Sequence, residues 1–185
     1  VPIVGERVDA HKFIPQVMKA GALATLSERV LDNADFPYIA VESSLQAVKD
    51  IAEFYLKQLQ IPVVGITGSV GKTTTREMIS TVLASQKKVF QTIGNQNSQI
   101  GVPLTLSHLT REDEIAVLEI GMSERGQIEK LTNMIRPNVA VVTMIGVSHI
   151  AQLKTQENIC LEKMDIVKGL PEDGICLLYT SPSPR

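Results

Sequence analysis

The residues best suited to chemistry lie in one short run of glycines, a lysine and threonines, Gly68-Ser69-Val70-Gly71-Lys72-Thr73-Thr74-Thr75. A polyphosphate needs converging backbone N–H groups, the partial positive charge of a helix N-terminus, a mobile ammonium group and a hydroxyl that can hold Mg²⁺. Gly68, Gly71, Lys72 and Thr73 supply these groups in that order. The run therefore predicts a phosphate-binding loop.

This loop is shorter than the usual pattern of a glycine, four residues and Gly-Lys-Ser/Thr, which would require a glycine at Ile66. The alternative is a glycine-rich turn before a capped helix, but a turn has no use for a lysine followed by three threonines. An apolar β-branched run precedes the loop, and a helical pattern follows it. The helical pattern contains Met78, Ile79, Val82 and Leu83. We expect a strand, the loop and then a helix.

The loop belongs to a repeating pattern of strands and helices. We expect strands at Val63–Thr67, Val89–Gln91, Ile115–Ile120 and Val139–Thr143. Three of these are continuous apolar runs, which is typical of a parallel sheet covered by helices on both faces. Ligands bind such α/β sheets at the carboxyl ends of the strands. Polar or glycine-rich residues follow every strand, including Thr92–Asn97, Gly121–Ser123 after Glu119, and Gly146–His149.

A smaller unit is expected before the loop. Apolar spacing predicts a helix from His11 to Gly21, and short strands are expected at Ala22–Leu26 and Tyr38–Val41. Ser43 and Gln46 then form a capping box for a longer helix that ends before Pro62. We place a domain boundary close to residue 60.

Composition limits the class of protein. The 185 residues are 44% hydrophobic and 21% charged, which is ordinary for a globular protein. The net charge is -2, and the charged residues form no long run of one sign. We therefore expect no nucleic-acid partner and no anionic-membrane surface. No stretch predicts membrane insertion. Cys160 and Cys176 lack metal-ligand spacing, which favours a reducing cytoplasm.

Taken together, these motifs resemble the Mur ligase family, ATP-dependent enzymes that add amino acids to the cell-wall precursor. The short loop Thr-Gly-Ser-x-Gly-Lys-Thr-Thr of that family accounts for Ile66. Three further stretches are similar to the branch that joins D-alanyl-D-alanine to a UDP-N-acetylmuramoyl-tripeptide. They are Thr92-x-Gly94-Asn95-x-Asn97 continuing to Leu106, Glu119-x-Gly121-Met122-Ser123, and Ile145-Gly146-x-Ser148-His149.

The resemblance runs from about Gly5 to about Gly174 and implies a domain organisation. Residues 1–60, with the Gly5–Phe13 motif, would be the C-terminal part of a uridine-nucleotide-binding domain. Residues 61–177 would be an incomplete ATP-binding central domain. Residues 178–185 form a tail that has no core pattern and resembles translated adapter sequence. We therefore expect a fragment truncated at both ends.

The resemblance also implies a reaction. A peptide carboxylate attacks the γ-phosphate of ATP to give an acyl phosphate, and an amine then displaces phosphate to form an amide. Lys72 would bridge the β- and γ-phosphates. The backbone from Gly68 to Thr74, including Ser69, Val70 and Gly71, would cradle them.

Two Mg²⁺ ions are implied. Thr73 and Glu119 would hold the first, and His149 and Lys163 the second, with Lys163 carbamylated by CO₂. From the residues alone, a lone histidine after a strand is more often structural, but the position of His149 at the carboxyl end of the fourth predicted strand favours a functional role. Lys163, in the helical stretch Asn158–Ile166, would be a solvated surface lysine.

Thr92, Asn95 and Asn97 would contact the muropeptide or phosphate, although an Asn-rich turn explains them almost as well. A monomer is expected. Three alternatives remain. The chain could be a nucleotide-binding module without turnover, or a sibling ligase that adds a different amino acid. It could also be a small-molecule kinase or switch ATPase, but those usually end the comparable strand in Asp, where this chain has Glu119.

Overall fold

The computed structural model describes residues 1–5, 8–32 and 34–179. The chain divides into two compact units, Val1–Ile51 and Ala52–Arg185, and the division falls within helix α2 (Ser44–Leu59). The boundary expected near residue 60 lies at the C-terminal end of that helix. Glu6 and Arg7 of the N-terminal motif, and the tail from Thr180 onward, lie outside the described residues.

The first unit is a small α/β arrangement. Its elements are η1 (Ala10–Phe13), α1 (Ile14–Lys19), β1 (Thr25–Ser27), β2 (Tyr38–Ala40) and the start of α2. The two strands pair in parallel. β1 begins three residues later than the sequence predicts, because Leu23 and its neighbours form no ladder and Leu23 is 88% exposed.

The start of α2 contains half of the predicted capping box. The Ser43 hydroxyl accepts a hydrogen bond from the Gln46 N–H at 3.3 Å, as expected for an N-terminal cap. The Gln46 side chain does not return to Ser43, because it donates to the Asp50 carboxylate at 2.7 Å. The hydroxyl alone therefore supplies the cap.

The second unit contains a five-stranded parallel sheet, which confirms the predicted fold class. The strand order is β4-β5-β3-β6-β7, with β3 (Val63–Thr67) in the centre. It pairs with β5 (Ile115–Glu119) on one side and with β6 (Val139–Val142) on the other, and β4 (Val89–Gln91) and β7 (Ile175–Leu178) are the edge strands. Each predicted strand is present, and β5 and β6 end one residue earlier than predicted. β7 includes Leu178, the first residue of the expected tail.

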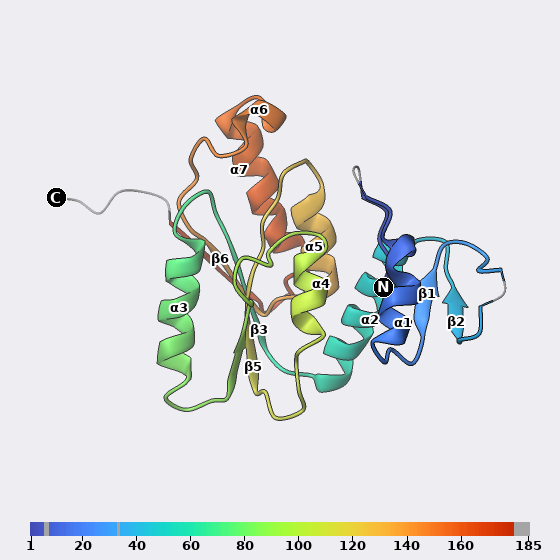
Figure 1. Cartoon of the computed structure of the whole chain (residues 1–185). Coiled ribbons are helices and arrows are strands. Elements are labelled where there is room, and N and C mark those ends of the chain that lie inside the picture. Colours follow the sequence, from blue (N-terminus) through green and yellow to red (C-terminus); the bar gives the residue numbers. More distant parts are fainter. Residues whose placement is uncertain (6–7, 33, 180–185) are drawn as a thin grey trace. The chain divides into compact units, whose positions relative to one another are not determined.

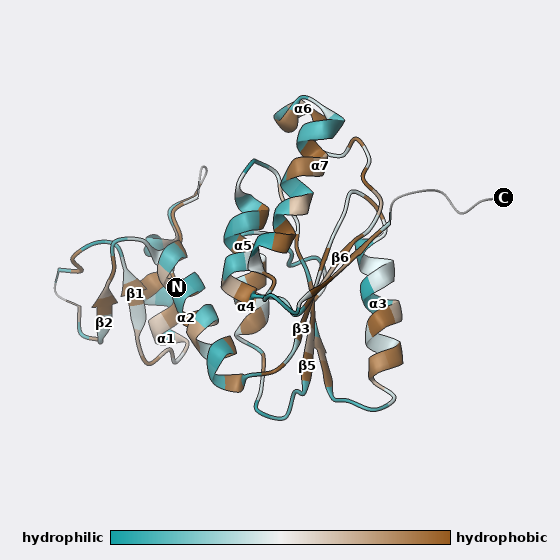
Figure 2. Cartoon of the chain, turned by 180° about the vertical axis from the view of Figure 1, so that it is seen from behind, coloured by the Kyte–Doolittle hydropathy of each residue, from teal (hydrophilic) through white to brown (hydrophobic). Residues whose placement is uncertain are grey.

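Helices cover both faces of this sheet (Figure 1). α3 (Lys72–Leu83) lies against one face, and α4 (Gly101–Leu106), α5 (Gln127–Ile135) and α7 (Gln156–Met164) lie against the other. The strands between them are hydrophobic along their length (Figure 2). A large apolar cluster fills the α5 face, and a smaller one, centred on Val64, Ile66 and Val117, fills the α3 face.

Short helices complete the unit around α7. They are α6 (Ile150–Leu153) before it and η2 (Asp165–Gly169) after it. Because all five strands run in parallel, their carboxyl ends meet at one edge of the sheet. Within the part of the chain that the structure describes, no helix is long and apolar enough to cross a membrane.

Candidate active site

The phosphate loop connects β3 to α3 and is fixed by the segment that follows β6. The Ser69 N–H donates to the Met144 carbonyl at 2.8 Å, and the Thr143 hydroxyl donates to the Val70 carbonyl at 2.7 Å. Gly68 has a φ of 153°, and a Cβ added there would lie 1.8 Å from the Thr143 hydroxyl oxygen. This position therefore requires glycine. The loop enters α3 through Gly71, whose φ is 89°.

Lys72 is the first residue of α3 and folds back over the loop. Its Nζ donates to the Gly68 carbonyl at 2.8 Å. Burial lowers the pKa of Lys72, and the nearby charge of Glu119 opposes that shift. The ammonium group thus lies at the helix N-terminus, where a phosphate oxygen could replace the carbonyl.

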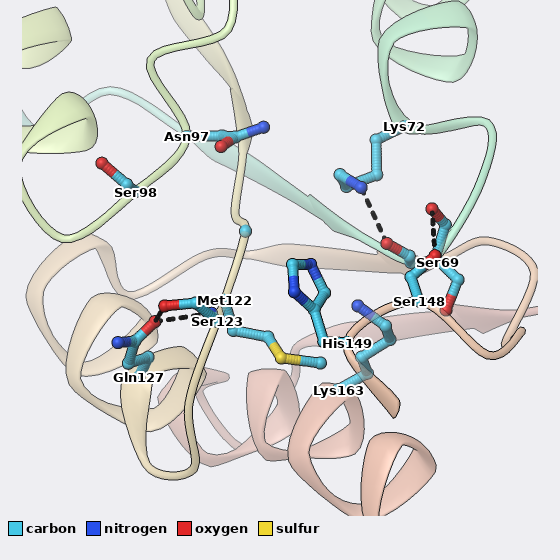
Figure 3. A pocket seen from close by; sticks show the side chains of 12 residues that line it. Ser69, Lys72, Asn97, Ser98, Met122, Ser123, Gln127, Ser148, His149 and Lys163 are labelled. Atoms are coloured by element: carbon cyan, nitrogen blue, oxygen red, sulfur yellow. Dashed lines mark hydrogen bonds between the residues drawn. The ribbon is translucent and has the colours of Figure 1, made fainter. Parts of the chain in front are cut away.

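A cavity of about 240 Å³ opens beside Lys72. Lys72 from α3, His149 from the loop after β6 and Lys163 from α7 point toward the same space (Figure 3). His149 has a φ of 66°, in the left-handed region that a residue with a Cβ rarely adopts. The surrounding structure therefore holds this histidine at the cavity.

The surroundings of this cavity lower the pKa of two of its basic side chains. Lys163 is only 2% exposed, and burial followed by the charge of Lys72 lowers its pKa to about 8, although Glu162 opposes the shift. Burial lowers the pKa of His149, and the charges of Lys163 and Lys72 lower it further. Because cations crowd one another here, the cavity is suited to an anion, which would relieve the repulsion.

Glu162 fixes the helix that carries Lys163. Its carboxylate accepts hydrogen bonds from the N–H groups of Gly126 at 2.7 Å and Ile128 at 3.0 Å. These groups lie at the N-terminus of α5, where backbone donors have no partner within the helix. A buried carboxylate on α7 therefore caps α5, and Lys163 is presented from a fixed position.

Glu119 ends β5 and is 1% exposed. The Asn97 side-chain amide lies 3.5 Å from its Oε2, which is a long contact, and Arg76 Nη1 lies 3.1 Å from its Oε1. The Glu119 N–H donates to the Thr92 hydroxyl at 2.8 Å. Thr92 thus lies beneath Glu119 and is not among the residues that line the cavity.

The structure brings together about half of the residues predicted for the site. Those that line the cavity are Gly68, Ser69, Lys72, Asn97, His149 and Lys163. Val70 and Gly71 instead line a second cavity of about 680 Å³, together with aliphatic residues of β6 and β7 and the residues that follow these strands. Thr73, Thr74 and Asn95 are exposed beside the site.

Arg76 is a residue of this region that the sequence reasoning missed. It is 5% exposed and contacts both Glu119 and the loop after β4. The available signal was its spacing, because a residue four positions after Lys72 lies on the same face of a helix.

Few of the side chains near Glu119 could bind a metal ion. Among the described residues, no three His, Cys, Asp or Glu side chains gather in a way that could hold a metal ion by themselves. Glu119 Oε1 is nevertheless buried and accepts no hydrogen bond from the described part of the chain. This combination fits Mg²⁺, which usually takes one or two carboxylates and completes its shell with water and substrate phosphates.

Comparisons with known proteins agree with this geometry. Residues 66–182 match the family model of the Mur ligase middle domain. The chain is 43% identical over 186 aligned residues to the UDP-N-acetylmuramoyl-tripeptide--D-alanyl-D-alanine ligase of Bacillus subtilis, and the alignment covers 100% of this chain and 40% of that protein. The chain thus spans about two fifths of the length of the curated relatives it matches.

Solved structures give the same match. A MurF structure from Acinetobacter baumannii superposes with a TM-score of 0.91 at 32% identity, covering 96% of this chain and 39% of that one. The MurF ligase of Thermotoga maritima in complex with ADP has a TM-score of 0.89 at 37% identity, covering 96% of this chain and 41% of that one.

Proposed function

Because this chain belongs to the Mur ligase family, through the middle domain of that family, we propose that it carries the ATP site of a peptide ligase. The proposed reaction joins D-alanyl-D-alanine to the free carboxylate of a UDP-N-acetylmuramoyl-tripeptide, as the names of its relatives describe for them. The observation that carries the proposal is the convergence of Lys72, His149 and Lys163 on one cavity beside a phosphate loop.

The first step brings two anions together. The tripeptide carboxylate attacks the γ-phosphorus of ATP, the bond to the β-phosphate oxygen breaks, and an acyl phosphate and ADP result. Repulsion between these anions is the main barrier, so positioned cations and N–H donors provide most of the catalysis. Lys72 would leave the Gly68 carbonyl and bridge the β- and γ-phosphates, and the backbone from Gly68 to Thr74 would cradle them.

In the second step the amine of D-alanyl-D-alanine attacks the acyl carbon. Phosphate leaves with the electrons of the C–O bond, and the nitrogen loses a proton as the amide forms. His149 lies at the cavity with a lowered pKa, so its imidazole is largely neutral at pH 7 and could accept that proton or bind a metal.

Mg²⁺ fits the residues around Glu119. Thr73 and Glu119 would hold one ion, whose role would be to neutralise the γ-phosphate charge. His149 and Lys163 would hold a second. Thr73 is exposed at the first turn of α3 and Glu119 is buried at the end of β5, so a metal would be held from both elements.

Lys163 could bind a metal ion only after it loses its positive charge. Its pKa of about 8 leaves a fraction of the amine neutral at pH 7, and a neutral amine can attack CO₂. The nitrogen forms a bond to the carbon of CO₂ and loses a proton to solvent, so the resulting carbamate is an anion with oxygen ligands. We propose that Lys163 is carbamylated, in keeping with the family resemblance.

Contacts to the substrates would come from the loop after β4. Asn97, which lines the cavity, and the exposed Asn95 are candidates for contacts to the muropeptide, with Thr92 supporting their loop. The first unit would belong to the domain that binds the uridine nucleotide. We expect a cytoplasmic monomer, and the free thiols of Cys160 and Cys176 suit a reducing compartment.

The test measures phosphate release by the complete ligase that carries this sequence. Release should require ATP, Mg²⁺, the UDP-linked tripeptide and D-alanyl-D-alanine together. With hydroxylamine in place of the dipeptide, the acyl phosphate should be captured as a hydroxamate of the tripeptide. Phosphate release that is independent of the tripeptide, or a ligase that prefers a single amino acid over the dipeptide, would contradict the proposal.

A further inference from the structure

Arg76 is a buried cation to which the proposed reaction gives no role. It lies on α3, one helical turn after Lys72, and is 5% exposed. A charged group is stable in the interior only where partners compensate for the water it has lost. The partners of Arg76 therefore indicate which parts of the site it holds.

One nitrogen of the guanidinium connects α3 to the segment after β4 and to the end of β5. Its Nη1 donates to the carbonyl oxygens of Thr92 at 2.9 Å and Gly94 at 3.0 Å, and lies 3.1 Å from Oε1 of Glu119. Nη2 donates to the carboxylate of Glu77 at the exposed rim of α3. Arg76 thus ties the helix of the phosphate loop to the segment after β4 and to the end of β5.

Glu119 is held from two directions as a result. Arg76 contacts its carboxylate, and the Thr92 hydroxyl accepts a hydrogen bond from its N–H at 2.8 Å. Arg76 also fixes Thr92 through the Thr92 carbonyl. The contact at Glu119 Oε1 is an ion pair without hydrogen-bond geometry, so that buried oxygen keeps lone pairs available for a second cation.

We infer that Arg76 is a positioning residue for the metal of the nucleotide complex. It keeps the Glu119 carboxylate and the Thr92–Gly94 segment at a fixed placement relative to Lys72, so that less freedom is lost when Mg²⁺ binds. This inference rests on the proposed function. The positive charge of Arg76 opposes a metal at Glu119, so the inference requires that orientation outweighs repulsion, and the direction of the effect of a substitution decides between the two.

The experiment uses the complete ligase and follows Mn²⁺, as a paramagnetic substitute for Mg²⁺, by electron paramagnetic resonance in the presence of ADP. In Arg76→Met the affinity for Mn²⁺ should weaken by about 10–100-fold, the range usual when a partner of a metal ligand is removed. Arg76→Lys keeps a charge and a donor and should recover most of the affinity. Arg111→Met, which changes an exposed arginine before β5, is the matched control and should leave the affinity unchanged.

A second readout separates positioning from general support of the fold. Binding of ADP without metal, measured by calorimetry, should be unchanged in Arg76→Met. Thr92→Val keeps Arg76 but removes the hydroxyl beneath Glu119, and should also weaken Mn²⁺ binding. This variant tests the inference even where Arg76→Met fails to fold.

Two results would overturn the inference. One is an affinity for Mn²⁺ that is equal or higher in Arg76→Met, which would mean that charge repulsion dominates. The other is an equal loss of ADP binding with and without metal, which would mean that Arg76 only supports the loop. A wild-type ligase that binds no nucleotide and releases no phosphate would instead contradict the proposed function.

Discussion

Lys72 is the residue on which the phosphate-loop assignment depends most directly. Lys72→Ala should lower the rate of acyl-phosphate formation by at least about 100-fold, because it removes the cation that would bridge the transferring phosphate. The fold should persist, since the Nζ makes one hydrogen bond, to Gly68. Hydroxamate formation in the complete ligase measures the rate, and circular dichroism checks the fold. Near-normal turnover in this variant would refute the assignment.

Lys163 leads to a prediction about pH. Only the neutral amine forms a carbamate, and a pKa of about 8 means that the neutral fraction rises steeply between pH 7 and pH 9. Carbamate formation releases two protons below this pKa and one above it, so at constant CO₂ pressure the ratio of carbamate to free amine, followed by NMR with ¹³CO₂, should rise steeply up to about pH 8 and less steeply above it. A lysine with an ordinary pKa would keep the steeper dependence up to about pH 10.5.

Lys163→Met is the control for that experiment, because it keeps an apolar stem of similar length without an amine. The adduct should disappear in this variant, and ligase activity should be lost with it. An adduct that remains in Lys163→Met, or full activity without it, would contradict the proposed role.

The sequence predicted some site residues well because their chemistry is local. The phosphate loop is one continuous segment, so spacing alone identified Lys72. Lys163 and Arg76 are different, because a charged residue on a helix is normally solvated, and only the packing of α7 against α5 and of α3 against the sheet buries them. Their environment depends on contacts distant in sequence.

At the scale of elements, the cap between α7 and α5 should contribute measurably to stability. Glu162→Gln keeps the shape of the side chain but leaves one backbone N–H of α5 facing an NH₂ group in the interior. The free energy of unfolding should fall by about 1–3 kcal/mol, the usual cost of leaving a buried hydrogen-bond donor without a partner. Urea denaturation measures it. Glu172→Gln, in an exposed turn, is the control, and equal stability of both variants would refute the role of the cap.

The contact between β6 and the phosphate loop should affect nucleotide affinity more than stability. Thr143→Val preserves shape but leaves the Val70 carbonyl without its donor, so the loop loses one restraint. A net loss of about 1 kcal/mol is expected, which corresponds to roughly a fivefold weaker affinity for ADP. Calorimetry measures this. Thr81→Val, which removes an exposed hydroxyl elsewhere on α3, should have no effect.

The strands were easier to predict than the helices between them. A buried parallel strand is a continuous apolar run, so Val63–Thr67 and its neighbours stand out from the sequence alone. α4 has only six residues and includes Pro103, so its sequence is too short and irregular to predict a helix. In α3, Met78 and Val82 fit a helical pattern but are 66% and 72% exposed, while Arg76 and Ser80 face inward. Periodicity identified that helix but not its buried face.

For the whole molecule, the sequence and the structure place the division between the two units differently. The sequence predicts a boundary near residue 60, just before β3. The compact units instead divide within α2, and the second half of that helix packs into the sheet unit. Ala52 and Leu56 are buried in its core, and the Tyr55 hydroxyl donates to the Leu109 carbonyl at 2.9 Å.

Two truncations of the complete ligase distinguish these boundaries. Removal of residues 1–43 keeps α2 intact, so the ATP site should still bind ADP while binding of the UDP-linked tripeptide is lost. Removal of residues 1–59 also deletes Ala52 and Leu56 from the core, and the free energy of unfolding should fall further, by about 2–5 kcal/mol for the loss of Leu56 alone. Thermal denaturation and ADP calorimetry compare the two. Equal stability of both variants would mean that the units divide near residue 60, and loss of ADP binding on removal of residues 1–43 would mean that the nucleotide site depends on the first unit.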